Sequence, residues 1–352
     1  MSPPRELASA PGDLRHNVRV VRRLLSFTVT PEQYRMVAYA ALVVCTLIVF
    51  TGAAVRVTGS GLGCPDWPRC DGTSLTPELS SHALIEFGNR LLTAVVGLPC
   101  VAAALLAWRR RPFRRDIALV ALLLPLGVAG QAVLGGFTVI YGLEPGWVIG
   151  HFLLSMLLLV ACVALVWKAR YERGTRPPAA DALTRWAIRG LVAFGAVTLA
   201  AGTVATAAGP HAGGGGTGDV VPRLDWRGAE TFDWAIHQHG ALATVLGLAS
   251  VGVWFLARAR RASRVTQDSL TAVCVLLACQ GLVGAAQYAM EVPPTMVWIH
   301  VVLAALTWLA LLWSAASAGQ RAEQKEPARS TSAVDPGSPA AWTSTPSSSR
   351  ST

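Results

Sequence analysis

Eight long apolar runs constrain the fold of this chain more than any other feature of its sequence. Each run can cross a hydrocarbon core about 30 Å thick, which takes about 20 residues of α-helix. Charged residues make up 14% of the chain and lie mostly between the runs, whereas soluble proteins carry roughly 25%. The sequence therefore predicts an all-α polytopic membrane protein and excludes a soluble enzyme. The expected transmembrane spans are 37–57, 86–107, 117–140, 147–167, 187–208, 234–257, 269–290 and 294–316.

The basic residues are concentrated in every second connection between the spans. The chain has a net charge of +10, but these charges form no single basic patch or stripe, so nucleic acid is not an expected partner. Arginines gather in 108–115, 168–185, 258–264 and the N-terminal segment, whereas 141–147 and 291–295 contain no basic residue. By the positive-inside rule, both termini and the arginine-rich loops are cytoplasmic. We expect a multi-pass protein of the plasma membrane, surrounded by lipid.

The expected organisation has five parts. Residues 1–36 form a basic cytoplasmic segment with no apolar run near its start that resembles a cleaved signal peptide. Residues 37–167 form a first four-helix half with an outer loop at 58–85, and residues 187–316 form a second half. A cytoplasmic linker, 168–186, joins the halves. Residues 317–352 are rich in Ser, Thr, Pro and Ala and are predicted to be a disordered cytoplasmic tail.

Several features recur at a nearly constant offset, which predicts that the two halves are related. Because each half has an even number of spans, both enter the membrane from the same side, and the repeat is parallel, about an axis along the membrane normal. Coincidence among helices rich in Gly and Ala is the alternative. The corresponding pairs are Gly52 and Gly202, Asn89 and His239, Gln131 and Gln280, Gly135 and Gly284, and His151 and His300.

Four of the seven histidines lie within or at the start of spans, near the outer face: His151, His237, His239 and His300. Imidazole is the usual axial ligand of haem iron. His239 and His300 fall at similar depth in the second half and could hold a haem between helices; interhelical hydrogen bonding is the alternative. His237 lies about 200° round the helix from His239 and is the alternative ligand. The repeat then predicts a second pocket at position 89 and His151.

Polar residues of the first half gather beside this second pocket. Glu86 and Asn89 are three residues apart and therefore share a helix face. The Glu86 carboxyl would lie beside the bound group, or would be an interfacial carboxylate stabilised by the helix dipole. Arg90 could bind a haem propionate or extend to the membrane interface.

Two cysteines, Cys64 and Cys70, lie in the first outer loop, on the oxidising side of the membrane. Their Cys-x5-Cys spacing differs from the redox motif Cys-x-x-Cys. A structural disulfide is the main expectation, with a redox-active pair or free thiols as alternatives.

The first outer loop, 58–72, reads TGSGLGCPDWPRCDG and closely resembles that of haem A synthases. The segment 86–90, EFGNR, resembles their Glu-x-x-His-Arg segment, and the segments around His151, His239 and His300 resemble their other haem-ligand helices. The resemblance covers about 37–316. It implies an enzyme that oxidises the C8 methyl of haem O to a formyl group by successive hydroxylations, for cytochrome oxidase assembly.

The same resemblance implies roles for particular residues. It implies a haem b held by His239 and His300, a substrate haem in the first half, and an essential role for Glu86. It further implies that Cys64 and Cys70 are disulfide-linked or redox-active. An electron donor or acceptor is a further expected partner, and the haem O synthase is a candidate partner.

The sequence departs from the family pattern at Asn89, where the family has histidine. Because carboxamides are poor iron ligands, we predict that a haem in the first half is held by His151 alone. The departure leaves either an open iron position or weak binding of the substrate haem. Substitution by His82 or Glu86 is a third alternative.

Two rival functions remain open at this point. One is a non-catalytic membrane electron carrier with a bis-histidine haem b, which would give no role to Glu86 or the first outer loop. The other is a haem transporter or chaperone, which the shallow ligands on one side of the membrane disfavour.

Overall fold

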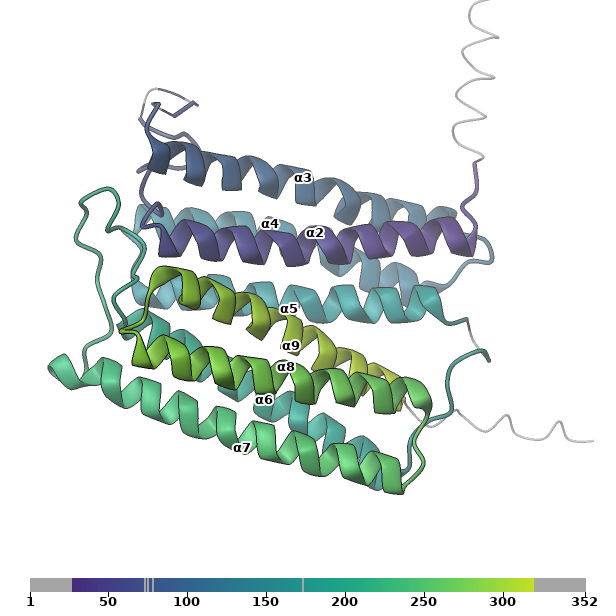
Figure 1. Cartoon of the computed structure of the whole chain (residues 1–352). Coiled ribbons are helices and arrows are strands. Elements are labelled where there is room, and N and C mark those ends of the chain that lie inside the picture. The colour runs from purple at the N-terminus through teal and green to yellow at the C-terminus, as the bar shows by residue number, and fades with distance from the viewer. Residues whose placement is uncertain (1–26, 73, 75, 78, 173, 320–352) are drawn as a thin grey trace, which may run out of the picture. The chain divides into compact units, whose positions relative to one another are not determined.

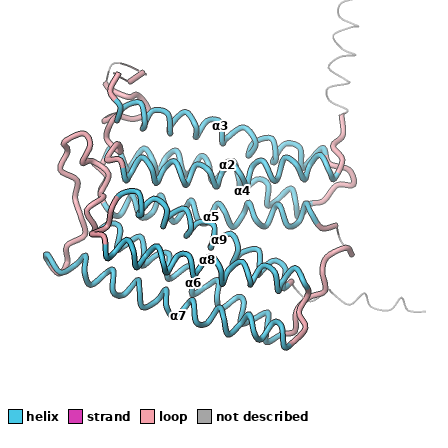
Figure 2. The backbone as a smooth tube through the Cα atoms, in the orientation of Figure 1, coloured by secondary structure: helices cyan, strands magenta, loops and turns pink. Residues whose placement is uncertain are grey.

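The computed structural model describes residues 27–72, 74, 76–77, 79–172 and 174–319. All regular elements in these ranges are helices, which confirms the all-α class (Figure 2). Residues 1–26 and 320–352, which include most of both predicted tails, lie outside the described residues. The elements are α2 (Pro31–Val57), α3 (Ser81–Arg109), α4 (Arg115–Ile140), α5 (Pro145–Arg170), α6 (Ala182–Ala208), a short 3-10 helix (Gly228–Glu230), α7 (Thr231–Ala259), α8 (Arg264–Ala289) and α9 (Pro294–Ala318).

Polar caps set where several of these helices begin. The side chains of Thr30, Ser80, Asp181 and Ser263 each accept a hydrogen bond from a backbone N–H in the first turn, which satisfies a donor that has no partner within the helix. These caps lie several residues before the predicted spans. The helices are therefore longer than the apolar runs that revealed them.

The first four helices and the last four pack in the same order (Figure 1). Helix α2 packs on α3 and α5, and α4 packs on α3 and α5. Helices α6 to α9 repeat this order: α6 packs on α7 and α9, and α8 packs on α7 and α9. The sets meet where α9 contacts α2 and α5 and where α5 contacts α6. This order is the one that the predicted repeat requires, although the repeat itself stays a prediction.

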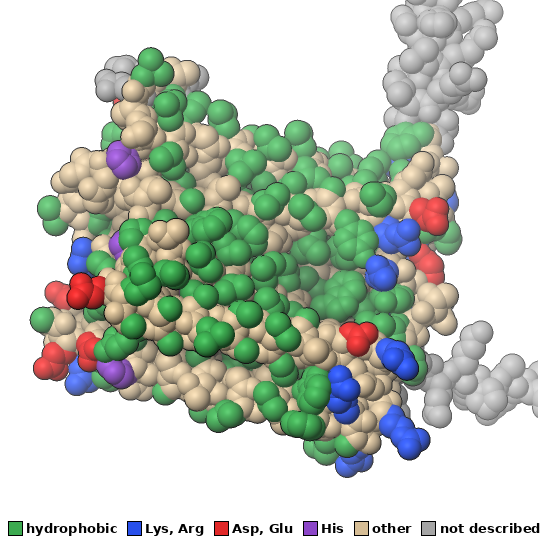
Figure 3. All heavy atoms as spheres, viewed as in Figure 1, with side chains coloured by type: hydrophobic (Ala, Val, Ile, Leu, Met, Phe, Trp, Pro, Cys, Tyr) green, Lys and Arg blue, Asp and Glu red, His purple; other side chains and the backbone are tan. Residues whose placement is uncertain are grey.

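Small residues allow the first helices to pack closely, whereas large apolar residues cover the outside. The residues without exposed surface include Ala38 and Ala41 of α2, Ala103 of α3 and Ala118 of α4, as is common where membrane helices meet. Large apolar side chains of the helices, by contrast, point outwards, and examples that are about two-thirds or more exposed are Leu98, Leu126, Leu248 and Leu282. Apolar side chains cover much of the face shown in Figure 3. All eight helices are long and apolar enough to cross a membrane, and the chain is a multi-pass membrane protein.

The connections gather at two opposite ends of the helices. The connections 110–114, 171–181 and 260–263 lie where α2 begins, and we call this the arginine-rich end. The connections 58–80, 141–144, 209–227 and 290–293 lie at the opposite end, which we call the disulfide end because it contains Cys64 and Cys70. In the view of Figure 3, most Lys and Arg side chains lie at the arginine-rich end. The assignment of this end to the cytoplasm stays a prediction.

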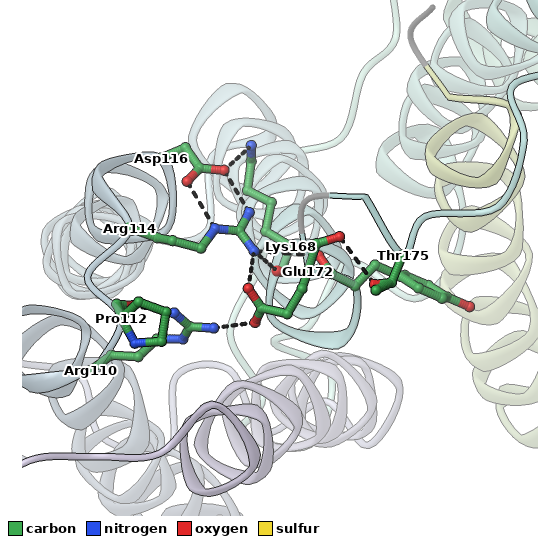
Figure 4. A network of polar contacts seen from close by, with 8 residues as sticks. Arg110, Pro112, Arg114, Asp116, Lys168, Glu172 and Thr175 are labelled. Atoms are coloured by element: carbon green, nitrogen blue, oxygen red, sulfur yellow. Dashed lines mark hydrogen bonds and ion pairs between the residues drawn. The ribbon is translucent and has the colours of Figure 1, made fainter. Parts of the chain in front are cut away.

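An ion-pair network joins the connections at the arginine-rich end (Figure 4). Arg114 donates to Asp116 at 2.8 Å and to the carbonyl of Lys168 at 2.9 Å. Arg110 has no exposed surface and pairs with Glu172. The network therefore ties the connection between α3 and α4 to the end of α5.

Candidate functional site

Two histidines of the second half, on different helices, have their rings next to each other. The ring centroids of His239 on α7 and His300 on α9 are 6.1 Å apart, and the ring planes are inclined by 72°. Two imidazoles that bind one metal from opposite sides have centroids about 6 Å apart, since each metal–nitrogen bond is about 2 Å long. The pair can therefore hold a metal centre between α7 and α9.

The ring nitrogens of these two histidines have different surroundings. The Nδ1 atom of His239 lies 3.1 Å from the carbonyl oxygen of Thr198. A hydrogen bond from Nδ1 to a carbonyl leaves Nε2 as the ligand atom, which is the usual arrangement around metal-bound histidine. The Nδ1 atom of His300 is buried and has no hydrogen-bond partner among the residues that the structure describes. A buried polar atom that has no protein partner points to a partner of another kind, such as a water or an ion.

Two glycines make room for these rings. A Cβ atom at Gly202 of α6 would lie 2.9 Å from His239 Cε1, and one at Gly284 of α8 would lie 3.2 Å from His300 Cε1. A larger residue at either position would therefore press on the imidazole. The second-half site thus includes all four helices α6 to α9.

His237, the alternative ligand, lies outside this pair. Its side chain is exposed, its Nδ1 atom lies 2.8 Å from the carbonyl oxygen of Asp233, and its ring stacks edge-on against Tyr288. The geometry therefore favours His239 over His237 as the partner of His300.

His151 on α5 has the same surroundings as His300. Gly135 of α4 faces its ring, with a Cβ position 3.2 Å from His151 Cε1. Gln131 donates to the carbonyl of His151 at 3.2 Å, as Gln280 does to that of His300 at 3.1 Å. The Nδ1 atom of His151 is likewise buried and without a partner.

Asn89 differs from its counterpart His239. The hydroxyl of Thr51 donates to Asn89 Oδ1 at 2.8 Å, so that the amide is tied to α2. At Gly52, the counterpart of Gly202, a Cβ atom would have no neighbour within 4 Å. The first half therefore has open space where the second half has an imidazole.

Glu86 is buried, and both of its carboxylate oxygens accept hydrogen bonds. Oε2 accepts from the backbone N–H of Cys64 at 2.8 Å, and Oε1 accepts from Arg90 at 2.5 and 3.1 Å. Arg90 also donates to the carbonyls of Cys64, Asp66 and Arg69. Sequence reasoning did not anticipate that Arg90 fastens the loop. The four-residue spacing of Glu86 and Arg90 was the available signal for their ion pair.

The first outer loop is closed by a disulfide between Cys64 and Cys70. The two cysteines are therefore bonded to each other, and the choice between a structural and a redox-active disulfide stays a prediction. Trp67, between the two cysteines, packs against Gly136 of α4, where a Cβ atom would lie 2.9 Å from its ring. Gly136 adjoins Gly135, the residue that faces His151. The loop therefore extends from Glu86 on α3 to the part of α4 beside His151.

His82 belongs to this loop region and not to the pocket. It lies within the first turn of α3, whereas the sequence placed it before the second span. Its Nδ1 atom lies 2.8 Å from Ser60 Oγ, and its ring fills the space beside Gly216. Because Asn89 is seven residues further along α3, about 10 Å away at 1.5 Å per residue, His82 does not replace it.

Comparison with known proteins identifies the family. The model of the COX15-CtaA family, described as cytochrome oxidase assembly protein, matches residues 35–83 and 76–312. The chain belongs to this family. The match includes the disulfide loop and the histidines described above, His82, His151, His237, His239 and His300.

Curated proteins that are similar to this chain carry the name heme A synthase. The protein of Lysinibacillus sphaericus is 34% identical over 129 residues, which are 36% of this chain and 42% of that protein. The protein of Halalkalibacterium halodurans is 29% identical over 134 residues, 38% of this chain and 45% of that protein. The protein of Bacillus cereus strain AH187 is 29% identical over 120 residues, 34% of this chain and 39% of that protein. The alignments span less than half the length of these relatives.

Proposed function

We propose that this protein is a haem A synthase, which oxidises the C8 methyl of haem O to a formyl group for cytochrome oxidase assembly. The observation that carries the proposal is that two unlike histidine pockets lie towards one end of the helices. The pocket at His151 adjoins a loop fastened by a buried carboxylate, and the other has a facing histidine pair. The family and the names of its curated relatives support the same function.

A haem b fits the second half. His239 and His300 would supply the axial ligands, as their ring spacing, the Thr198 hydrogen bond and the unpartnered His300 Nδ1 allow. Bound there, the haem would supply one-electron redox chemistry to the reaction. The protein contributes the orientation of both rings and the glycines that admit them.

The substrate haem O would lie in the first half, against His151. Two successive hydroxylations of its C8 methyl would give a geminal diol, which loses water to form the aldehyde. Glu86 is the group we assign to hold or move a proton during these steps. Arg90 holds the Glu86 carboxylate in place, and Trp67 of the disulfide loop packs on Gly136, next to the glycine that faces His151.

Glu86→Gln tests the role of the carboxylate. The amide oxygen can still accept from the N–H of Cys64, but the group no longer carries a proton between ionised and neutral forms. We expect haem to stay bound while formation of haem A from added haem O falls strongly, measured by extracting pigments from the membrane protein. Glu144→Gln is the matched control, because Glu144 is exposed at the same end and caps no helix through its side chain. Normal output of haem A by the Glu86 variant would refute the assignment.

The same pigment analysis separates the rival functions. An electron carrier or a haem transporter would return haem O unchanged, and only a synthase returns a formylated haem. His300→Ala tests the ligand pair: we expect loss of the six-coordinate low-spin spectrum of the second-half haem. An unchanged spectrum would show that another pair holds it.

The proposal includes a location and partners. We place the protein in the plasma membrane with the arginine-rich end and both termini in the cytoplasm, which the gathering of Lys and Arg at that end supports. The pockets then lie near the outer face. An electron donor or acceptor is required by the chemistry, and the enzyme that makes haem O is a candidate neighbour.

A further inference from the structure

We propose that the first-half pocket holds its haem through His151 alone and keeps the opposite face open as a binding site for a neutral diatomic ligand, beside Gly52 and Asn89. This inference rests on the proposed function in taking haem as the group that both halves bind. It places the binding of a small ligand in the first half only. The residue on which it depends is Asn89, the counterpart of His239.

The two halves differ at one pair of corresponding positions. In the second half, the ring of His239 fills the space at Gly202, where a Cβ atom would lie 2.9 Å from Cε1. In the first half, the counterpart of that histidine is Asn89, and a Cβ atom at Gly52 would meet nothing within 4 Å. The volume that an axial imidazole occupies in one pocket is therefore free in the other.

Local hydrogen bonds hold Asn89 in its place. In the second half, the carbonyl oxygen of Thr198 lies within hydrogen-bond distance of the imidazole Nδ1 of His239. The counterpart of that carbonyl, on Ile48, lies 3.2 Å from the hydroxyl of Thr51, which also lies 2.8 Å from Asn89 Oδ1. The short Asn89 side chain is thus tied to α2 by Thr51, and a carboxamide is in any case a poor ligand for iron.

The other candidate ligands at this end are already bound to protein groups. Both oxygens of Glu86 accept hydrogen bonds from Cys64 or Arg90. The Nδ1 atom of His82 is bonded to Ser60, and its ring packs at Gly216. Of the three alternatives that Asn89 raises, ligand replacement by Glu86 or His82 therefore finds no support in the geometry.

The surroundings of His151 also argue against weak binding of haem in the first half, because they match those of His300. His151 keeps a facing glycine, a glutamine on its carbonyl and a buried, unpartnered Nδ1, as His300 does. A haem iron with one histidine ligand has a vacant position, and steric access and nearby polar groups then decide which small molecules bind there. Here the access is the space at Gly52, and the polar groups are Thr51 and Asn89.

Carbon monoxide is the probe for this site, because it binds ferrous haem only at a vacant position. The full-length protein in detergent is loaded with haem b, reduced and titrated with carbon monoxide, both as wild type and as a His239→Ala/His300→Ala double variant that lacks both second-half ligands. We expect the wild type to bind one carbon monoxide per chain. The double variant should show a high-spin spectrum that carbon monoxide converts to low-spin.

Three variants identify the site. Asn89→His should give a six-coordinate low-spin spectrum before any carbon monoxide is added and should lose carbon monoxide binding, because Gly52 leaves room for the ring and Ile48 O can accept its Nδ1–H. Gly52→Leu should also lose the binding but without a low-spin spectrum, since it fills the space and supplies no ligand. Gly88→Leu is the matched control, because Gly88 is exposed on α3 and a Cβ atom there meets nothing within 4 Å; this variant should bind carbon monoxide as the wild type does.

The outcomes separate this inference from the proposed function. The inference is overturned if the wild type takes up no haem in its first half, if that haem is low-spin without carbon monoxide, or if both Asn89→His and Gly52→Leu bind carbon monoxide as the wild type does. Formation of haem A together with any of these results would leave the proposed function standing. Carbon monoxide binding as expected, but without formation of haem A from haem O, would refute the proposed function and leave this inference intact.

Discussion

A glycine faces each of the histidine rings that we assign to haem, and this pairing is the residue-scale feature that decides where a haem can lie. Gly202 is the tightest case, because a methyl group there would lie 2.9 Å from His239 Cε1. We expect Gly202→Ala to turn the imidazole away from His300 and to weaken the low-spin spectrum of the second-half haem. Absorption spectra of the purified variant, with haem content measured on the same sample, check this.

Gly52→Ala is the control for that change. It makes the same substitution at the corresponding helix position, and both variants exchange Gly for a better helix former. A methyl group at Gly52 meets nothing within 4 Å, so the second-half spectrum should stay as in the wild type. If Gly202→Ala retained the wild-type spectrum too, close packing of Gly202 against His239 would not be what fixes the ring.

Residue patterns predicted part of the site and missed the rest for identifiable reasons. Helical spacing placed Glu86 and Asn89 on one face of α3, because such spacing depends only on local geometry. The ion pair of Glu86 with Arg90 was not predicted, although their four-residue spacing allows it. The hydrogen bonds from Arg90 to the loop carbonyls were missed, since they depend on how an irregular loop folds back. The choice between His237 and His239 likewise required the direction in which α7 faces.

At the scale of elements, the helices were predictable and their ends were less so. An apolar run of about 20 residues has few alternatives to a membrane helix, because unpaired backbone groups are costly in lipid. The helix ends depend on single caps such as Thr30 and Asp181, which lie outside the runs. The burial of Arg110 was not foreseen, because a basic residue in a connection is usually solvated.

The ion-pair network at the arginine-rich end yields a prediction about an element junction. Arg110 is wholly buried and pairs with Glu172, whose side chain is 38% exposed. Glu172→Gln removes the charge that compensates Arg110. The amide oxygen of Gln can still accept from Arg110, but the bond loses its ionised acceptor; hydrogen bonds to charged groups contribute about 1.5–3 kcal/mol, so we expect the free energy of unfolding to fall by up to about that amount, measured by denaturant titration in micelles.

The control for this variant is Glu230→Gln. Glu230 is exposed in the short 3-10 helix at the disulfide end, and its substitution should leave the unfolding transition unchanged. An equal effect of the two substitutions would mean that loss of any acidic charge destabilises the protein. The ion-pair network would then not be a specific stabilising contact between α5 and the connection of α3 to α4.

At the scale of the whole molecule, polar side chains join the two sets of four helices. The indole of Trp298 donates to the carbonyl of Phe50 at 2.9 Å, and that of Trp308 donates to the carbonyl of Met156 at 3.0 Å. Neither contact was predictable from the sequence, because a tryptophan in an apolar run looks the same whether it faces lipid or another helix. The internal offset predicts two similar halves but contains no information on how they meet.

Arg56 makes the join at the disulfide end. Its Nε and one terminal nitrogen donate to the carbonyls of His211 and Thr206, at 2.9 and 3.2 Å, so that the end of α2 is fastened to the end of α6 and the loop after it. Lysine keeps the charge but cannot present two donors in a planar fork. We therefore expect Arg56→Lys to lower the free energy of unfolding by about 1–3 kcal/mol.

The decisive measurement for Arg56→Lys is whether one unfolding transition becomes two. If this guanidinium couples the halves, the haem spectra of the two pockets should be lost at different denaturant concentrations in the variant and together in the wild type. Arg69→Lys is the control, because Arg69 is exposed in the disulfide loop and its side chain, among the described residues, donates to the carbonyl of Gly72. A single, unshifted transition for Arg56→Lys would mean that the tryptophans and the apolar contacts of α9 with α2 and α5 suffice to make the eight helices one cooperative unit.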